Sequence, residues 1–396
     1  MPVPHLPLEL VERILSFAFP DPAPGKVWLP RTPYRERRKI GSIIACVCRA
    51  WRPLGLKLAW RNLGVSLRTN EDVKQFEEIL AGRCHSSYVR TAVIHVVTEP
   101  PSAYPPRRID NFLAVCPHIE TLALWNSSML VSDFLSLPTM SSAAQKTASN
   151  LKHLELRQAP GDWDPQHILR FALPSLPNLS SLILAYPCFV EPLAADTGSK
   201  SGAKRVLPSL QHLELSTASD PPRWGGERLT IKNLAPFVNV DRLTSFKLIL
   251  FHPPNLMQLS SLLAPTLLSL TIVVNDADAQ SYLSNLCEVL FATSKLQHFR
   301  LETILHTAAY PWVPPDFPAF LKALPTSLVS SHIDLNISPA ALNIVSTAFL
   351  PSRLASPLEK WSCRAVKVFE GIGPRAALMA FEKLEVTGGA KSWVAW

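Results

Sequence analysis

The feature that most constrains the fold of this chain is a short apolar phrase that recurs from about residue 88 onward. An apolar residue is followed by two variable residues, a second apolar residue, one variable residue and a third apolar residue. The clear copies are Ile119/Leu122/Leu124, Leu151/Leu154/Leu156, Leu179/Leu182/Leu184, Leu210/Leu213/Leu215, Leu243/Phe246/Leu248, Leu267/Leu270/Ile272 and Leu296/Phe299/Leu301. Their starts lie 32, 28, 31, 33, 24 and 29 residues apart. Self-similarity at this period predicts a stack of structural repeats.

Each copy of the phrase predicts a strand with one buried face and one wet face. In the second clear copy, Leu154 and Leu156 alternate with His153 and Glu155, so the leucines point to one side of the strand and the polar residues to the other. Helix-forming stretches such as residues 166–173, 280–291 and 317–324 separate the strands. One strand with one helix cannot bury its own apolar face, so neighbouring repeats must stack.

This plan resembles the leucine-rich-repeat solenoid, an α/β fold. The resemblance covers residues 64–396 and implies about 9–11 irregular repeats, with parallel strands on a concave side and helices on a convex side. Weaker copies are Tyr88/Thr91/Val93, Leu328/Ile333/Leu335, Leu358/Trp361/Cys363 and Phe381/Leu384/Val386. The asparagine of the family, three residues after the last anchor, is matched among the clear copies only by Asn275. An irregular horseshoe is therefore expected.

A (β/α)8-barrel enzyme is the rival fold, because it also alternates strands and helices at about this period. Barrel strands are covered on both faces and read as nearly continuous apolar runs. Here the positions between the anchors are polar and belong in water: His153/Glu155, His212/Glu214, Ser245/Lys247 and His298/Arg300. The pattern favours the open solenoid over the barrel.

The polar positions of the strands form rows across the predicted sheet, and these rows are the candidate substrate-binding surface. Its members are Trp125, His153, Glu155, Arg157, His212, Glu214, Lys247, His298, Arg300 and Glu302. Mixed charge with a few apolar and aromatic residues suits a protein ligand, whereas nucleic acid would need a consistently basic face. The alternative is a merely solvated sheet face. The three histidines recur too far apart to share one metal ion, since adjacent strands lie about 4.8 Å apart.

Motifs for catalysis, cofactor binding and membrane insertion are missing from the sequence. It contains no G-x-S-x-G, no glycine-rich phosphate loop and no H-E-x-x-H, so no catalytic, metal or cofactor-binding residue is predicted. The uncharged stretch 253–275 is interrupted by Pro265 and by several hydroxyl residues, which favours a buried helix, turn and strand over a membrane span. Seven scattered cysteines without a C-x-x-C pair indicate reduced thiols in the cytoplasm or nucleus.

The first 63 residues form a separate, basic helical unit. They contain eleven Lys/Arg and four Asp/Glu, a balance of +7 out of the net +8 of the whole chain. Leu6, Leu10, Ile14 and Phe17 lie on one face of a first helix. A second helix carries a wide apolar stripe from Ile40 to Trp51, and a third begins near Pro53. Three short helices expose more apolar surface than they can bury, and the excess predicts a docking surface.

Three segments of this unit carry a specific resemblance. They are Leu6-Pro7-x-Glu9-Leu10-x-x-x-Ile14-Leu15, then Val47-Cys48-Arg49-x-Trp51, then Trp60-Arg61-x-Leu63. Together they resemble an F-box, the module that docks onto the acidic SKP-type adaptor of a cullin-RING ubiquitin ligase. The resemblance implies that Leu6, Pro7, Leu10, Ile14, Val47 and Trp51 lie at or behind the adaptor interface. A proline-rich insert at 20–37 departs from the family pattern.

The sequence thus favours a non-enzymatic substrate-recognition subunit, with the F-box-like domain at 1–63 and the repeat domain at 64–396. Its expected partners are the adaptor with its cullin-RING complex and an unidentified protein substrate, with no nucleic acid and no membrane. Two alternatives stay open: a repeat scaffold that does not serve a ligase, and the barrel enzyme. Two low-complexity patches, 139–150 and 194–205, are expected to be surface loops between repeats.

Overall fold

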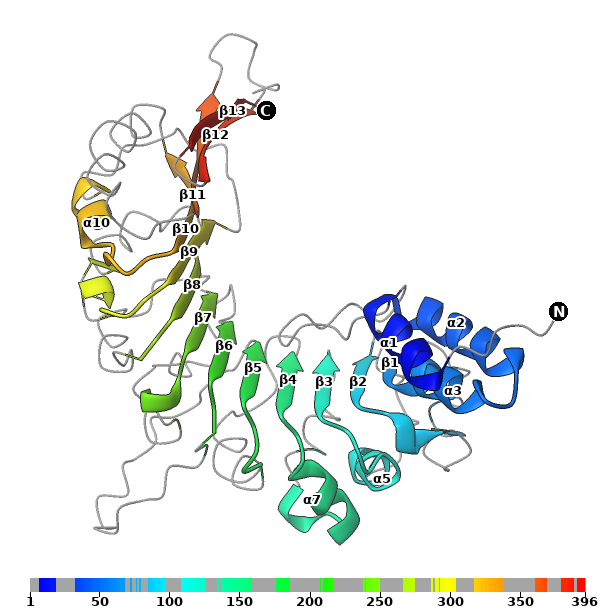
Figure 1. Cartoon of the computed structure of the whole chain (residues 1–396). Helices are drawn as coiled ribbons and strands as arrows, with labels where there is room; N and C mark the ends of the chain where they lie inside the picture. Colours follow the sequence, from blue (N-terminus) through cyan, green and yellow to red (C-terminus); the bar gives the residue numbers. More distant parts are fainter. Residues whose placement is uncertain are drawn as a thin grey trace, which may run out of the picture. The chain divides into compact units, whose positions relative to one another are not determined.

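The computed structural model describes residues 7–18, 33–67, 72, 76, 78–79, 85–96, 108–125, 134, 137–157, 176–185, 207, 209–216, 238, 240–249, 266–274, 286–287, 289–291, 293–303, 317–337, 360–368, 379–387 and 390–395. Figure 1 shows these elements coloured along the chain. The chain divides into two compact units. The first unit is residues 1–186 with 206–209, and the second unit is residues 187–205 with 210–396. The domain boundary predicted at residue 63 stays a prediction.

Three helices open the first unit: α1 (Leu8–Ala18), α2 (Pro33–Val47) and α3 (Arg52–Trp60). Proline stands in the first turn of α3, where its missing N–H costs no hydrogen bond. Helix α2 begins at Pro33, so the last five residues of the predicted 20–37 insert are helical. Residues 20–32 of that insert lie outside the described part of the chain.

Helices α2 and α3 cross at a contact between their backbones. A Cβ atom added to Gly41 would lie 2.5 Å from the Ala59 nitrogen and 2.7 Å from the Gly55 carbonyl oxygen. A Cβ atom added to Gly55 would press equally hard on the Ala45 backbone. Real side chains do not tolerate such distances, so the two glycines fix how closely these helices approach.

Five parallel strands follow in the first unit: β1 (Asn62–Leu67), β2 (Thr91–Val96), β3 (Thr121–Trp125), β4 (His153–Arg157) and β5 (Ser181–Ala185). Each pairs with the next in chain order. The repeat anchors align in register, with Leu122 opposite Leu154 and Leu154 opposite Leu182. These anchors are fully buried. The prediction of one strand per repeat is confirmed here.

The crossovers of the first unit contain helix α5 (Arg108–Val115), helix α7 (Ser142–Ala148) and the short 3-10 turns η1 (Ser86–Tyr88) and η2 (Leu137–Thr139). Helices α5 and α7 pack side by side (Figure 1). The surface loop predicted at 139–150 is therefore wrong, because its centre is helical. Ser141 caps α7 by accepting a 3.3 Å hydrogen bond from the Ala144 N–H. The Ser141 hydroxyl in turn donates to Asp110 of α5 at 2.5 Å.

The second unit continues the same scheme with β6 (His212–Ser216), β7 (Ser245–Ile249), β8 (Ser269–Val274), β9 (His298–Thr303), β10 (Ser330–Ile337) and β11 (Lys360–Val368). These strands are parallel and pair in chain order. The described residues between them include the 3-10 turn η6 (Val240–Arg242) and helix α10 (Phe317–Ala323).

The second unit ends in an antiparallel hairpin instead of a further repeat. Strand β12 (Met379–Thr387) runs antiparallel to β11, and β13 (Ala390–Ala395) runs antiparallel to β12. A parallel strand was expected at Phe381/Leu384/Val386. Only ten residues link β11 to β12 and two link β12 to β13, which is less than a helical crossover requires. The antiparallel direction follows from these short connections.

The sheet of neither unit closes into a ring. Among the described strands, β1 pairs with β2 alone and β13 pairs with β12 alone. A (β/α)8 barrel needs its first and last strands to pair. The barrel alternative is excluded, and the architecture is an α/β protein built from open, mostly parallel sheet.

Candidate functional site

The first candidate surface is formed by exposed apolar residues of helices α1 and α2. On α1, Leu10, Ile14 and Phe17 share one face and are exposed. Leu8 of α1 and Ile43 and Val47 of α2 are exposed as well. Phe17 is 90% exposed and Ile14 is 56% exposed. Surface helices of a folded domain usually turn such residues toward the core. Here they face solvent, as a docking surface requires.

The opposite side of α1 holds it to the rest of the helical group. Val11 is buried, and Glu12 forms an ion pair with Lys57 of α3. The hydrogen bond from Lys57 and its charge lower the pKa of the Glu12 carboxyl below its ordinary value. Arg38 of α2 lies 4.6 Å from the centroid of the Trp60 ring of α3, a cation–π contact between the two helices.

The predicted adaptor residues divide by their exposure. Pro7, Leu10, Ile14 and Val47 are exposed, and Trp51 is partly buried. Leu6 lies outside the described residues. The structure thus brings an apolar stripe of α1 to the surface, and whether an adaptor binds there stays a prediction.

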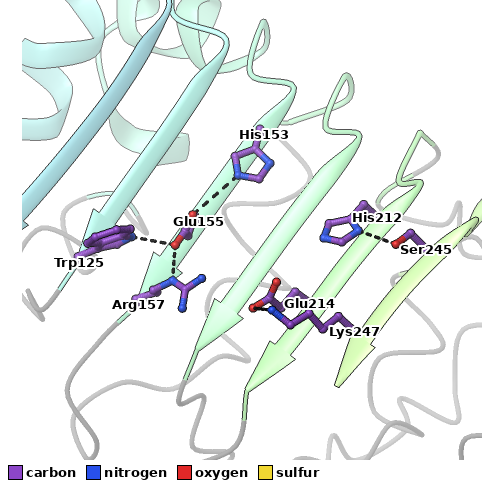
Figure 2. A network of polar contacts seen from close by, with 8 residues as sticks. All are labelled: Trp125, His153, Glu155, Arg157, His212, Glu214, Ser245 and Lys247. Carbon is purple, nitrogen blue, oxygen red and sulfur yellow. Dashed lines mark hydrogen bonds and ion pairs between the residues drawn. The ribbon is translucent and has the colours of Figure 1, made fainter. Parts of the chain in front are cut away.

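The second candidate surface is the sheet face opposite the leucine anchors, which we name the non-anchor face. In the first unit it is made by Thr121, Ala123 and Trp125 of β3, His153, Glu155 and Arg157 of β4, and Ser181, Ile183 and Ala185 of β5. Trp125 and Arg157 stand opposite each other in register. Four predicted binding residues, Trp125, His153, Glu155 and Arg157, therefore meet on two adjacent strands (Figure 2).

These four residues form one polar network around the Glu155 carboxylate. The Trp125 indole Nε1–H donates to Glu155 Oε1 at 2.9 Å, and Arg157 Nε donates to the same oxygen. The second oxygen, Oε2, lies 3.9 Å from His153 Nε2, which is too long for a hydrogen bond. The Arg157 guanidinium lies 5.8 Å from the Trp125 ring centroid, and His95 of β2 meets that ring edge-on.

The expectation that His153 and Glu155 lie in water is wrong. His153 is 4% exposed and Glu155 is 1% exposed. Their neighbours on the same face explain the burial, because Val93, Ala123 and Trp125 form a small buried apolar cluster there. Burial alone would raise the pKa of the Glu155 carboxyl, but His153 and Arg157 outweigh it and hold that pKa below its ordinary value.

Several buried polar atoms at this point have no hydrogen-bond partner in the structure. They are Glu155 Oε2, both ring nitrogens of His153 and the hydroxyl of Ser181. His153 and Ser181 stand opposite each other in the register of β4 and β5. Buried polar groups are nearly always paired, so this cluster of unpartnered atoms marks a special position on the face.

In the second unit the non-anchor face carries paired polar residues instead. Lys247 Nζ donates to Glu214 Oε1 at 3.1 Å, and His212 Nδ1 lies 2.9 Å from the Ser245 hydroxyl oxygen (Figure 2). Along β7 buried and half-buried residues alternate as the sequence predicts. Glu214 is the exception, since it is buried.

The remaining predicted residues meet near β9 and β10. Arg300 Nε donates to Glu302 Oε1 at 2.6 Å, and His298 Nδ1 lies 2.8 Å from the Ser330 hydroxyl oxygen. His332 Nε2 lies 3.8 Å from Glu302 Oε1. Within the second unit the predicted residues therefore form two groups, one around Glu214 and one around Glu302.

His95 and Ser330 belong to these groups although the sequence did not predict them, whereas Ser181 and Ser245 occupy polar positions of the predicted rows. Ser181, Ser245 and Ser330 each stand in register with a histidine of the adjacent strand. Comparing the first strand position of consecutive repeats would have found these pairs, since the histidine and the serine occupy the same slot one repeat apart.

A serine beside a histidine invites a catalytic interpretation, but the backbone opposes it. The Ser245 N–H donates to the Gln211 carbonyl, and the Ser330 N–H donates to the Gln297 carbonyl. Both N–H groups are used within the sheet and cannot stabilise an oxyanion.

No group of three or more His, Cys, Asp or Glu among the described residues is placed to hold a metal ion. Within the same residues, no helix has the length and apolar character needed to cross a membrane.

No family model and no curated protein matches this chain. One solved structure that it resembles is the leucine-rich repeat-containing protein LegL7 from Legionella pneumophila. The alignment covers 71% of this chain and 87% of that one, at 17% sequence identity and a TM-score of 0.37. Similarity at this level shows neither a common family nor a common function.

Proposed function

We propose that this chain is the substrate-recognition subunit of a SKP-cullin-F-box ubiquitin ligase, in which the helices dock the adaptor and the repeats hold a protein substrate. The observation that carries the proposal is the set of exposed apolar residues on α1 and α2, among them Leu10, Ile14 and Val47. These residues coincide with the F-box-like positions of the sequence. Exposed large apolar residues along one face of a helix are typical of a protein interface.

The charge of the helical unit supports the same partner. Residues 1–63 carry eleven basic and four acidic residues, a balance of +7. An acidic adaptor would be attracted to this unit over a distance, and the attraction would speed association more than it would tighten the complex. Such a subunit needs no catalytic group, because it acts by raising the local concentration of its substrate beside the conjugating enzyme.

Calorimetric titration of the full chain with a purified SKP-type adaptor tests the docking. Leu10→Asp and Ile14→Asp should each abolish binding, because each would place a charge in an apolar contact. Ser42→Asp is the matched control, since it adds the same charge to an exposed position of α2 and should leave the affinity unchanged.

Two outcomes would contradict the proposal. If the correctly folded wild-type chain fails to bind the adaptor, the chain is not a ligase subunit, and a repeat scaffold for protein interaction is the function that remains. If the wild type binds but both aspartate variants bind equally well, the face of α1 is not the interface.

A further inference from the structure

The cluster around Glu155 has an unused capacity to accept hydrogen bonds. Both described donors, Trp125 Nε1 and Arg157 Nε, go to Oε1, whereas Oε2 accepts no hydrogen bond and has only the 3.9 Å contact with His153 Nε2. An arginine that binds a carboxylate at full strength engages both oxygens side by side. Arg157 engages one, through Nε, so the carboxylate is only half used.

The unpartnered atoms share a chemical character. Glu155 Oε2 is an anionic acceptor, neutral histidine offers one acceptor nitrogen, and the Ser181 hydroxyl oxygen also accepts. Oε2 and His153 Nε2 lie 3.9 Å apart, so one donor atom about 2.8 Å from each can bridge them. The position calls for a compact group with several N–H donors.

A metal ion fits this position poorly. Zinc would hold nitrogen and oxygen ligands about 2.0 Å away in a tetrahedron, which brings two ligands closer together than 3.9 Å. A primary ammonium has three donors in a tetrahedral arrangement and matches the acceptors in number and kind.

Arg157 offers the route by which such a group would enter. Its side chain is 37% exposed, whereas that of Glu155 is 1% exposed, so a ligand arriving from solvent meets Arg157 first. If the ammonium takes the place of the Arg157 guanidinium, the buried carboxylate keeps one opposite charge throughout. The exchange therefore avoids the large cost of burying a second, unbalanced cation.

We propose that the Glu155 cluster is a receptor for a lysine side chain of a protein partner, with Arg157 as the residue that it displaces. The ammonium donates to Glu155 Oε2, His153 and Ser181, and the Trp125 ring lies beside it. The inference rests on the proposed role of the repeats in protein binding, and it names the chemistry that the non-anchor face recognises in the first unit.

Nuclear magnetic resonance of the full chain with 15N-labelled tryptophan tests the site. The probe is Nα-acetyl-lysine N-methylamide, with the norleucine analogue as an uncharged control of similar shape. The Trp125 Nε1–H signal, assigned with Trp125→Phe, should shift saturably with the lysine probe and stay still with the control.

The variants give opposite expectations. Glu155→Gln should lower the affinity for the lysine probe about tenfold, because it removes a charged acceptor. Arg157→Ala should tighten binding of the lysine probe several-fold, because the competitor is gone. Glu120→Gln, which changes an exposed carboxylate paired with Lys152, should change nothing. Arg157→Ala keeps the test valid even if Glu155→Gln fails to fold.

Three results would overturn the proposal: no saturable shift in either the wild type or Arg157→Ala, an equal response to the norleucine probe, or a weaker affinity in Arg157→Ala. None of these measurements involves the adaptor. A failed adaptor titration with a positive probe titration would reject the ligase function alone, and the reverse would reject the lysine site alone.

Discussion

The tetrapeptide His-Leu-Glu-Leu occurs twice in this chain, as residues 153–156 of β4 and 212–215 of β6. The leucines behave alike in both copies and are buried in their unit. The polar residues differ. Glu155 is bound by an indole and a guanidinium, whereas Glu214 is bound by Lys247 of the next strand. His212 meets the hydroxyl of Ser245, while His153 and Ser181 do not pair.

The partner of a polar strand residue is therefore set by the neighbouring repeat. Glu155 takes a donor from Trp125, thirty residues earlier, and Glu214 takes one from Lys247, thirty-three residues later. Parallel strands place residues one repeat apart directly beside each other. The same tetrapeptide therefore has two different environments, and each copy can be mutated separately.

The largest effect is expected from removing each glutamate in turn. Glu155→Ala should lower the free energy of unfolding by about 3 kcal/mol, because it leaves a buried indole N–H and a partly buried guanidinium without their acceptor. Glu214→Ala should cost roughly 1.5 kcal/mol less, since Lys247 can return to water. Urea denaturation followed by circular dichroism measures both.

Glu302, whose side chain is 25% exposed, provides the baseline for this pair. Its partner Arg300 has a side chain that is 56% exposed, so Glu302→Ala should change the stability by less than about 1 kcal/mol. Equal losses of stability for Glu155→Ala and Glu214→Ala would show that the two copies are equivalent despite their different partners.

Much of the architecture could be predicted from the sequence because it depends on periodic leucines. The spacing of Leu154, Leu182 and their equivalents fixes one strand per repeat and aligns the anchors in register. Helix α7 was missed because its cap is supported by Asp110, thirty-one residues before Ser141. The sequence window around 139–150 shows a polar, serine-rich segment and nothing of that carboxylate.

For the candidate site, the sequence predicted which residues belong to it but not their burial. The rows of the strands identified Trp125, His153, Glu155 and Arg157, and register brings them together. Their burial was not foreseen. Alternation along each strand predicts a solvent-exposed non-anchor face, but Val93 and Ala123 on the neighbouring strands β2 and β3 form a buried apolar cluster on that face. The close helix crossing at Gly41 and Gly55 was missed for a similar reason, because each glycine is explained only by the other helix.

The contribution of Glu155 to stability should depend on pH. Its pKa is lowered in the folded protein, so the charged carboxylate stabilises the fold above the ordinary glutamate pKa of about 4.3. This stabilisation is lost as the pH falls below that value toward the lowered folded pKa. Urea midpoints measured from pH 7 to pH 3 should therefore fall less steeply below pH 4.3 in Glu155→Gln than in the wild type. Parallel curves for the two proteins would contradict the assignment.

The smallest effects concern the serines, and their signs should differ. Ser245→Ala removes the hydroxyl that meets His212 at 2.9 Å and should cost about 1 kcal/mol of unfolding free energy. Ser181→Ala removes a buried hydroxyl that has no partner, so it should be neutral or stabilising by a similar amount. Thermal and urea unfolding of the two variants, side by side, measures the difference. A loss of stability in Ser181→Ala as large as that in Ser245→Ala would mean that His153 and Ser181 form a hydrogen bond in solution. The two copies of the tetrapeptide would then have similar environments on this side, despite their different neighbouring residues.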